Sequence, residues 1–290
     1  MNYQPFEWLT FQGNYAANYW ENHTSDFRKV VQTYKYDGSP YYRSPQKSTL
    51  NDQTSRDLRN LLTASATFDK QFNDHGIKAM VGYQQEDHRY DMHKGYRENY
   101  AFPDYPVLDA GGEENQKAYG NSYEWSLRSI FGRINYDYQG KYLFEANMRY
   151  DGSSRFAPET RWGNFWSLGA SWRVDREEFM QNTADWLSAL TLKASYGAQG
   201  NDNLGTYYAS SGLYSIVSQA GENALVSDRL ATPDLKWETN LNLNVGIDFS
   251  LFNNRFSGSF DFFQRRSKDL LYSRPLATSL GYTSMDENIG

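Results

Sequence analysis

The sequence has no cysteine and no long apolar run, and each absence excludes a class of protein. Without cysteine there is no disulfide, no thiol nucleophile and no cysteine-based metal site. No window approaches the roughly 18 to 20 continuous apolar residues of a spanning helix, which excludes a helical membrane protein. Excess positive charge is also lacking, since the net charge is -6, and this argues against a nucleic-acid partner.

Aromatic residues are abundant instead and reach 17% of the chain, with 24 tyrosines and 8 tryptophans. Tyrosine and tryptophan suit a boundary between an apolar phase and water. The opening residues MNYQPFEW lack the basic start and apolar stretch of a signal peptide. We therefore expect an exported protein of which this sequence is a fragment.

Apolar and polar residues alternate along many segments, as the two-residue period of a β-strand demands. The clearest case is NLNLNVGIDFSLFNNRFSGSFDFF, where apolar side chains from Leu241 to Leu251 alternate with asparagine, glycine, aspartate and serine. A turn at 253–254 follows, and the pattern resumes at Phe256. Similar segments predict about nine strands in all, most of them joined in hairpins.

Short and long connections alternate strictly along the chain. Tight turns fall at 73–76, 139–140 and 253–254, and long polar loops fall at roughly 18–59, 91–122 and 200–234. The link 175–189 belongs to the tight-turn side and is expected to hold a short amphipathic helix. This parity is typical of outer-membrane barrels, whose long loops lie outside the cell.

The predicted fold is therefore all-β, an antiparallel transmembrane β-barrel. Apolar strand faces are expected to contact lipid, small and polar faces a wet lumen, and aromatics the two interfaces. The side chains assigned to the lipid-facing or interfacial set are Tyr136, Tyr138, Tyr142, Phe144, Trp166, Trp172, Phe249 and Phe260.

Several stretches also resemble one known family. These are YDYQGKYLFEANMRYDGSSRFAPETRWGNFWSLGASWRVDREEF, LTLKASYGAQGNDNLGTYY, LKWETNLNLNVGIDFSLFNNRFSGSFDFFQRRSKDLLYS and the terminal NIG. In this order they are similar to the barrel region of SusC/RagA-type TonB-linked outer-membrane transporters. They cover about half of the chain, while the N-terminal 120 residues share only the general strand-and-loop pattern of the family and none of these motifs.

The resemblance implies a barrel of about 22 strands, plugged by an N-terminal domain and driven by the inner-membrane TonB complex. It also implies a SusD-like surface lipoprotein that caps the barrel and captures oligosaccharides or peptides. Residues 1–290 would form a partial barrel, without signal peptide, plug domain or closing strands, in the outer membrane of a Gram-negative bacterium. Such a piece is not expected to transport anything alone and leaves unpaired sheet edges.

The family signature also supplies the residues with the best claim to a substrate or partner contact. They lie in DGSSRF and in QGNDNLG, where Gly200 and Asn201 suit left-handed turn positions. The competing interpretation is structural: Asp151 and the serines would satisfy backbone amides, and Arg155 would pair locally. The candidate contact residues are Asp151, Gly152, Ser153, Ser154, Arg155, Phe156, Gly200 and Asn201.

No catalytic, metal or cofactor site is predicted. His88 and His93 lie near Asp87 and Asp91, but their spacing matches no tight ligand motif. The pairs Glu113-Glu114 and Glu177-Glu178 are adjacent in charged links, whereas acid and base chemistry needs two carboxyls across one cleft. Loop tyrosines such as Tyr41, Tyr105 and Tyr214 suit contact with a sugar or peptide, and packing between loops explains them equally well.

Two other functions remain open on the sequence alone. A small self-contained barrel of eight or ten strands would act as an adhesin or a passive pore, and it requires an even strand count and a signal peptide. A soluble all-β binding module such as a lectin would bury its apolar faces against each other. The uniformly polar opposite faces favour a water-filled lumen over this last alternative.

Overall fold

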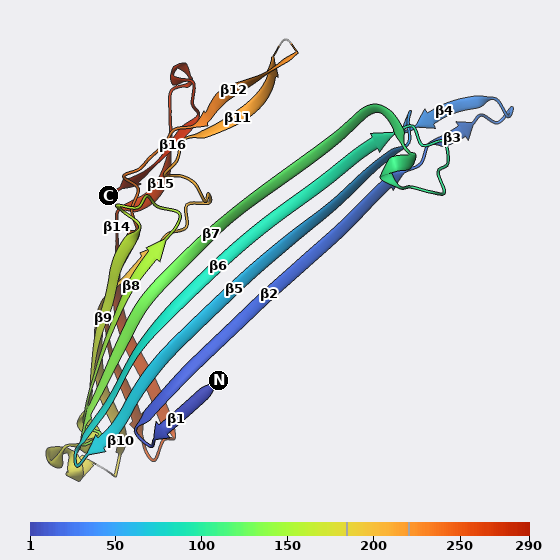
Figure 1. Ribbon diagram of the computed structural model, residues 1–290. Coiled ribbons are helices and arrows are strands. Elements are labelled where there is room, and N and C mark those ends of the chain that lie inside the picture. Colours follow the sequence, from blue (N-terminus) through green and yellow to red (C-terminus); the bar gives the residue numbers. More distant parts are fainter. Residues whose placement is uncertain (184, 220) are drawn as a thin grey trace. The chain divides into compact units, whose positions relative to one another are not determined.

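The computed structural model describes residues 1–183, 185–219 and 221–290. Its main element is a ten-stranded sheet with the order β1-β2-β5-β6-β7-β8-β9-β10-β13-β14 (Figure 1). The strands are β1 (Asn2–Phe6), β2 (Leu9–Arg28), β5 (Thr49–Phe72), β6 (His75–Glu98), β7 (Gly112–Tyr138), β8 (Tyr142–Ser153), β9 (Trp162–Arg173), β10 (Leu187–Asn201), β13 (Glu238–Leu251) and β14 (Phe256–Lys268).

Three two-stranded hairpins and four short 3-10 helices complete the described elements. The hairpins pair β3 (Val31–Tyr34) with β4 (Pro40–Ser44), β11 (Leu213–Gln219) with β12 (Glu222–Arg229), and β15 (Leu270–Pro275) with β16 (Ser284–Ile289). The helices are η1 (Leu108–Ala110), η2 (Val174–Arg176), η3 (Glu178–Thr183) and η4 (Thr278–Leu280). None of the helices in the described part of the chain has the length and apolarity needed to cross a membrane.

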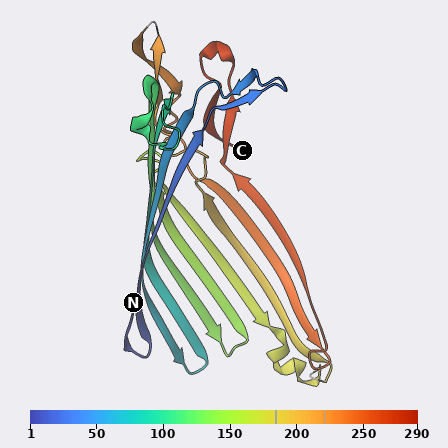
Figure 2. The same cartoon turned by 90° about the vertical axis from the view of Figure 1, so that its right-hand side faces the viewer.

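The chain divides into two compact units, and the four strands β2, β5, β6 and β7 contribute residues to both. Unit 1 comprises Met1–Tyr15, Leu61–Glu86 and Trp125–Gly290, and unit 2 comprises Ala16–Asn60 and Asp87–Glu124. In unit 1 the tight connections gather at one end of the strands (Figure 2). This arrangement agrees with the alternation of short and long connections in the sequence.

Register makes the apolar face of unit 1 continuous across six strands. Side chains directly opposite one another on neighbouring antiparallel strands share a face. One row reads Tyr136, Phe144, Ala170, Ala194, Val245 and Phe262 from β7 to β14. The row beside it reads Asn135, Glu145, Gly169, Ser195, Asn244 and Phe263, so this row of the opposite face is polar or small except at Phe263 on the last strand.

Nine of the ten sheet strands correspond to the nine predicted from alternation, and the short β1 was missed. The lengths of the predicted loops were wrong. Much of 18–59 and 91–122 belongs to strands. In the first segment β2 continues to Arg28 and β5 begins at Thr49, and in the second β6 continues to Glu98 and β7 begins at Gly112. These segments are mostly polar and carry no regular apolar face, so alternation of polarity could not reveal them, although backbone pairing still forms.

Unit 2 has a small packing centre. Leu50 is fully buried, and Tyr100 is buried with its ring edge-on to Phe27 at 5.1 Å between centroids. The Ser48 hydroxyl accepts a hydrogen bond from the Tyr100 amide at 2.8 Å, and the Ser48 carbonyl accepts one from the Asn99 amide at 3.0 Å. The connection from β6 to β7 is thereby fixed to the start of β5.

Candidate functional site

The DGSSRF segment ends β8 and begins the connection to β9, and most of it is buried in unit 1. Asp151 pairs with Arg149 at 3.2 Å, and Arg149 also donates to Ser129 Oγ at 3.0 Å. Gly152 lies opposite Trp162, whose ring occupies the space that a Cβ atom would need. Ser154 Oγ accepts the Ser126 amide at 2.8 Å, a short bond that ties the connection to β7.

Arg155 crosses to a distant part of the chain. Its Nη1 donates to the Asp202 carbonyl at 3.1 Å and lies 3.5 Å from the Asp202 carboxylate, which also accepts from Ser153 Oγ at 2.7 Å. The guanidinium carbon is 5.0 Å from the ring centre of Trp125 and 5.3 Å from that of Tyr207, the geometry of cation–π contacts. The expected local pairing of Arg155 was therefore wrong, because its partner follows 47 residues later.

Phe156 enters a buried core between the loops and the sheet. It packs with Phe165, Ala209, Leu235 and Trp237, and its side chain is 1% exposed. Trp237 Nε1 donates to the Arg161 carbonyl at 2.7 Å, so even the polar atom of this core is paired. The connections after β8, β10 and β12 thus share one hydrophobic core, which fixes their positions against the sheet.

Gly200 and Asn201 are the last residues of β10 and have no left-handed backbone, so the expected turn position was wrong. The left-handed glycine comes later, at Gly205, where φ is +68°. Gly200 is required for another reason, since an added Cβ would lie 2.2 Å from the Phe165 ring. A contact of these residues, or of DGSSRF, with substrate or partner stays a prediction.

The assigned lipid-facing aromatics all share the apolar face of unit 1. Tyr138, Tyr142 and Trp172 stack in sequence across β7, β8 and β9, with centroids 6.3 Å apart at each step. Glu177 then accepts hydrogen bonds from Tyr142 Oη at 2.6 Å and Trp172 Nε1 at 3.0 Å. The rings therefore present apolar faces with anchored polar tips, as aromatics at a membrane interface do.

The link that carries Glu177 consists mainly of the 3-10 helices η2 and η3, and its residue 184 lies outside the described residues. Hydrogen bonds from Tyr142, then Trp172 and Lys141, hold the pKa of the Glu177 carboxyl below its ordinary value. In place of the predicted amphipathic helix, the link therefore holds the two short 3-10 helices η2 and η3.

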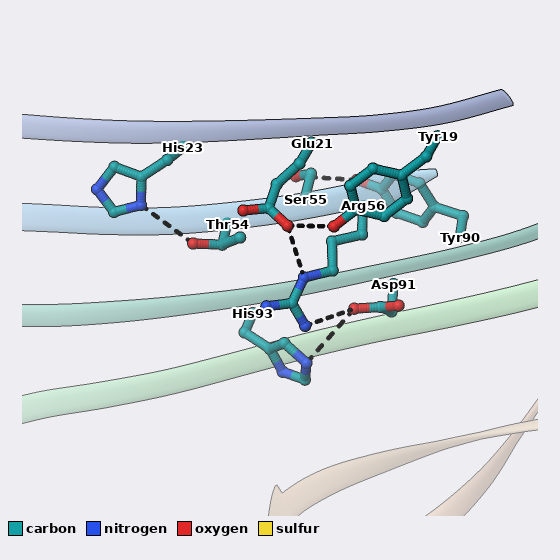
Figure 3. A network of polar contacts seen from close by, with 9 residues as sticks. All are labelled: Tyr19, Glu21, His23, Thr54, Ser55, Arg56, Tyr90, Asp91 and His93. Atoms are coloured by element: carbon teal, nitrogen blue, oxygen red, sulfur yellow. Dashed lines mark hydrogen bonds and ion pairs between the residues drawn. The ribbon is translucent and has the colours of Figure 1, made fainter. Parts of the chain in front are cut away.

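Unit 2 carries a polar network on strands β2, β5 and β6 (Figure 3). Arg56 Nε lies 3.0 Å from Glu21, which also accepts from Tyr19 Oη, and Arg56 Nη1 lies 4.0 Å from Asp91. His93 approaches Asp91 at 3.7 Å. The network joins three strands through exposed or half-buried charges, so we expect its contribution to stability to be small.

The histidines considered for metal binding serve as ion-pair or hydrogen-bond partners. His88 Nε2 lies 2.8 Å from the carboxylate of Asp57. Asp57 is on β5, whereas His88, Asp91 and His93 are on β6. Within 1–183, 185–219 and 221–290, no group of three or more histidine, aspartate or glutamate side chains has the geometry to hold a metal ion.

The chain matches the family model "TonB dependent receptor-like, beta-barrel" over residues 1–290. It is 33% identical over 232 residues to TonB-dependent receptor P3 of Formosa agariphila, covering 77% of this chain and 23% of that protein. It is 35% identical over 173 residues to TonB-dependent receptor SusC of Bacteroides thetaiotaomicron, covering 57% of this chain and 17% of SusC.

The structure is similar to the RagAB peptide importer in its closed-closed state, with a TM-score of 0.90 and 24% identity. The likeness covers 100% of this chain and 31% of that one. The chain therefore spans less than a quarter of the length of the two curated relatives and about a third of the solved structure. The family match and the ten-stranded antiparallel sheet together show that this chain belongs to the TonB-dependent receptor β-barrel family.

Proposed function

We propose that the chain is a section of the barrel wall of a TonB-dependent transporter in the outer membrane of a Gram-negative bacterium. The whole protein imports an oligosaccharide, with a peptide as the second candidate. The observation that carries the proposal is the register of unit 1, which places an unbroken apolar row beside a row that is small or polar except at Phe263. Lipid on one face and a wet lumen on the other account for both rows.

Exposure supports a membrane over a buried face. Phe260 is 72% exposed, Leu168 56% and Ile134 55%, all on the same face of the sheet. An apolar surface of this extent is rare on a soluble protein and marks a contact with another apolar phase. The soluble binding module considered from the sequence would bury these side chains against a second sheet.

The proposed partners follow from the resemblance to the SusC/RagA family. A SusD-like surface lipoprotein would cap the barrel on the side of the long connections, and the TonB complex would act through a plug region. The likeness to the RagAB peptide importer supports the fold and keeps peptides as the second candidate cargo. The small barrel acting as an adhesin or pore is disfavoured by the family match.

Single-cysteine labelling tests the membrane orientation in the intact protein, after any cysteine outside residues 1–290 has been replaced; residues 1–290 contain none. Asn244 and Val245 are neighbours on β13 and lie on opposite faces. In the intact protein in membranes, a water-soluble maleimide should label Asn244→Cys and leave Val245→Cys unlabelled. A hydrophobic maleimide delivered in lipid should reverse the preference. Equal labelling of both positions by the water-soluble reagent would contradict the proposal.

Uptake measurements test the transport function. Deletion of the gene should abolish growth on one oligosaccharide or peptide mixture while growth on its monomers persists. Complementation by the intact gene should restore uptake, and this restoration should require TonB. Growth of the deletion strain on every oligosaccharide and peptide tested would overturn the import role.

A further inference from the structure

One face of the unit 2 sheet carries tyrosines and lysines on the neighbouring strands β6 and β7. Tyr90 and Tyr123 stack with centroids 4.8 Å apart and 18° between the rings. Lys94 Nζ lies 5.9 Å from the ring centre of Tyr119, and Lys117 Nζ lies 5.8 Å from that of Tyr96. We call this set the tyrosine–lysine ladder: Tyr90, Lys94 and Tyr96 on β6, with Lys117, Tyr119 and Tyr123 on β7.

Strand geometry places the ladder residues on one face at regular intervals. Residues two apart on a strand point to the same side and lie about 7 Å apart along it. Lys94 and Tyr96 are two apart on β6, as Lys117 and Tyr119 are on β7. Each lysine faces a tyrosine of the other strand, so cation and ring alternate in both directions across the face.

Among the described residues, the two ladder lysines form no ion pair, unlike Lys47 and Arg56 of the same unit. Lys47 pairs with Glu98 at 2.9 Å, and Arg56 pairs with Glu21 at 3.0 Å. In the described part of the chain, neither Lys94 nor Lys117 forms an ion pair, although Lys117 acts electrostatically on Glu98. Lys117 is exposed and the Tyr119 side chain is 50% exposed, so both reach solvent.

We propose that the tyrosine–lysine ladder binds an oligosaccharide that bears carboxylate or sulfate groups. The half-exposed Tyr119 offers a rigid ring on which a sugar ring can stack, at low entropic cost. Ammonium groups donate charge-assisted hydrogen bonds to anionic substituents, and neither ladder lysine is held in an ion pair within the described residues. The inference rests on the proposed function and narrows its cargo from oligosaccharides in general to anionic ones.

Charge decides between this ligand and its closest competitors. A neutral sugar would need the rings and have no use for two unpaired ammonium groups. Single-stranded nucleic acid also stacks on aromatics beside cations. The proposed import of an oligosaccharide favours the saccharide over a nucleic acid, and oligothymidylate is therefore tested beside it. An acidic oligosaccharide needs only the local pair of charges that the ladder supplies.

Binding to the purified intact transporter tests the ladder, with a sulfated dextran oligosaccharide as the probe and neutral dextran of equal length beside it. The double variant Lys94→Gln/Lys117→Gln should bind the sulfated probe about tenfold or more weakly. The conservative pair Lys94→Arg/Lys117→Arg should retain the affinity. The control Lys29→Gln/Lys35→Gln removes two charges from unit 2 outside the ladder and should bind as the wild type does.

Tyr119→Leu separates the contribution of the ring from that of the charge, and it should weaken both the sulfated and the neutral probe. Unchanged affinity of Lys94→Gln/Lys117→Gln for the sulfated probe overturns the ladder, even where uptake of oligosaccharides continues and the proposed function holds. Oligothymidylate bound with equal affinity and equal lysine dependence also overturns it, in favour of a nucleic acid. A wild type that binds no saccharide and imports none refutes the proposed function as well.

Discussion

At the residue scale, individual contacts at the ends of strands decide how the connections sit. Gly200 and Glu177 are two such residues at opposite ends of the unit 1 strands. Gly200 leaves room for the Phe165 ring beside the core that holds Phe156. Glu177 gathers two aromatic donors and a lysine on one carboxylate. Each makes a prediction that a single substitution can check.

Gly200→Ala should destabilise the protein by about 1–3 kcal/mol, because the added methyl overlaps the Phe165 ring and nothing nearby is free to yield. The methyl of Gly13→Ala meets no atom within 4 Å and serves as the matched control. The temperature at which the intact barrel loses its folded migration in detergent gels measures both. Equal temperatures for the two variants would show that the loop core adapts to the extra methyl.

Glu177→Gln should flatten the dependence of stability on acidity. Hydrogen bonds from Tyr142 and Trp172 lower the pKa of the Glu177 carboxyl in the folded protein. The stability it contributes is therefore full above its unfolded pKa, near the ordinary value of 4.5, and is lost as the pH falls through the lowered folded pKa. Thermal unfolding of the wild type and of Glu177→Gln, measured from neutral to acidic pH, should converge at the acidic end.

Glu178→Gln is the control for this measurement, because it removes the same charge from the next position. A wild type and a Glu177→Gln variant that differ by a constant amount at every pH would refute the assigned role of the carboxylate.

At the scale of the single strand, alternation fixes which side chains can change. Val245 lies near the middle of β13 on the apolar face, and Asn244 lies beside it on the polar face. Val245→Lys should cost about 2–4 kcal/mol, the cost of a lysine near the bilayer midplane. Asn244→Lys should be close to neutral. Urea-induced unfolding from lipid vesicles measures the free energy of unfolding of both variants. A similar loss of free energy for the two would contradict a lipid-facing and a water-facing side of β13.

The same alternation explains how much of the fold the sequence could predict. Where one face is apolar, as from Leu241 to Leu251, the strand and its partner were identified. Where both faces are polar, as in β5 before Leu61, pairing by backbone hydrogen bonds leaves no trace in hydropathy. The strands of unit 2 were therefore predicted as loops, and unit 2 as a compact body was missed.

The candidate site was predicted only in part for a related reason. DGSSRF stood out through its resemblance to a family, but its partners Asp202, Tyr207 and Trp237 lie far along the chain. No local spacing indicates which distant side chain an arginine will reach. The ladder of unit 2 was likewise hidden, since it depends on the pairing of two strands assigned to a loop.

At the scale of the whole molecule, the ten-stranded sheet of the described residues ends in β1 and β14. Each terminal strand presents backbone groups that seek a partner strand. The 290-residue chain, expressed alone and refolded in detergent, should therefore form aggregates. Size-exclusion chromatography with light scattering measures this, and a monodisperse monomer would contradict it. The intact protein, prepared in the same way, is the control.

The described residues of the hairpin of β11 and β12 contribute no side chain to the core around Phe156 and Trp237. Its Ile216 and Leu225 side chains are each 72% exposed. Substitutions in Phe156 or Trp237 disturb several connections together, whereas those at Ile216 or Leu225 disturb no buried contact. Selection against substitutions should therefore be stronger in the buried core than in the hairpin. Across bacterial lineages the buried core should drift slowly while the hairpin diversifies, and sequence variation on this surface should concentrate between residues 213 and 229.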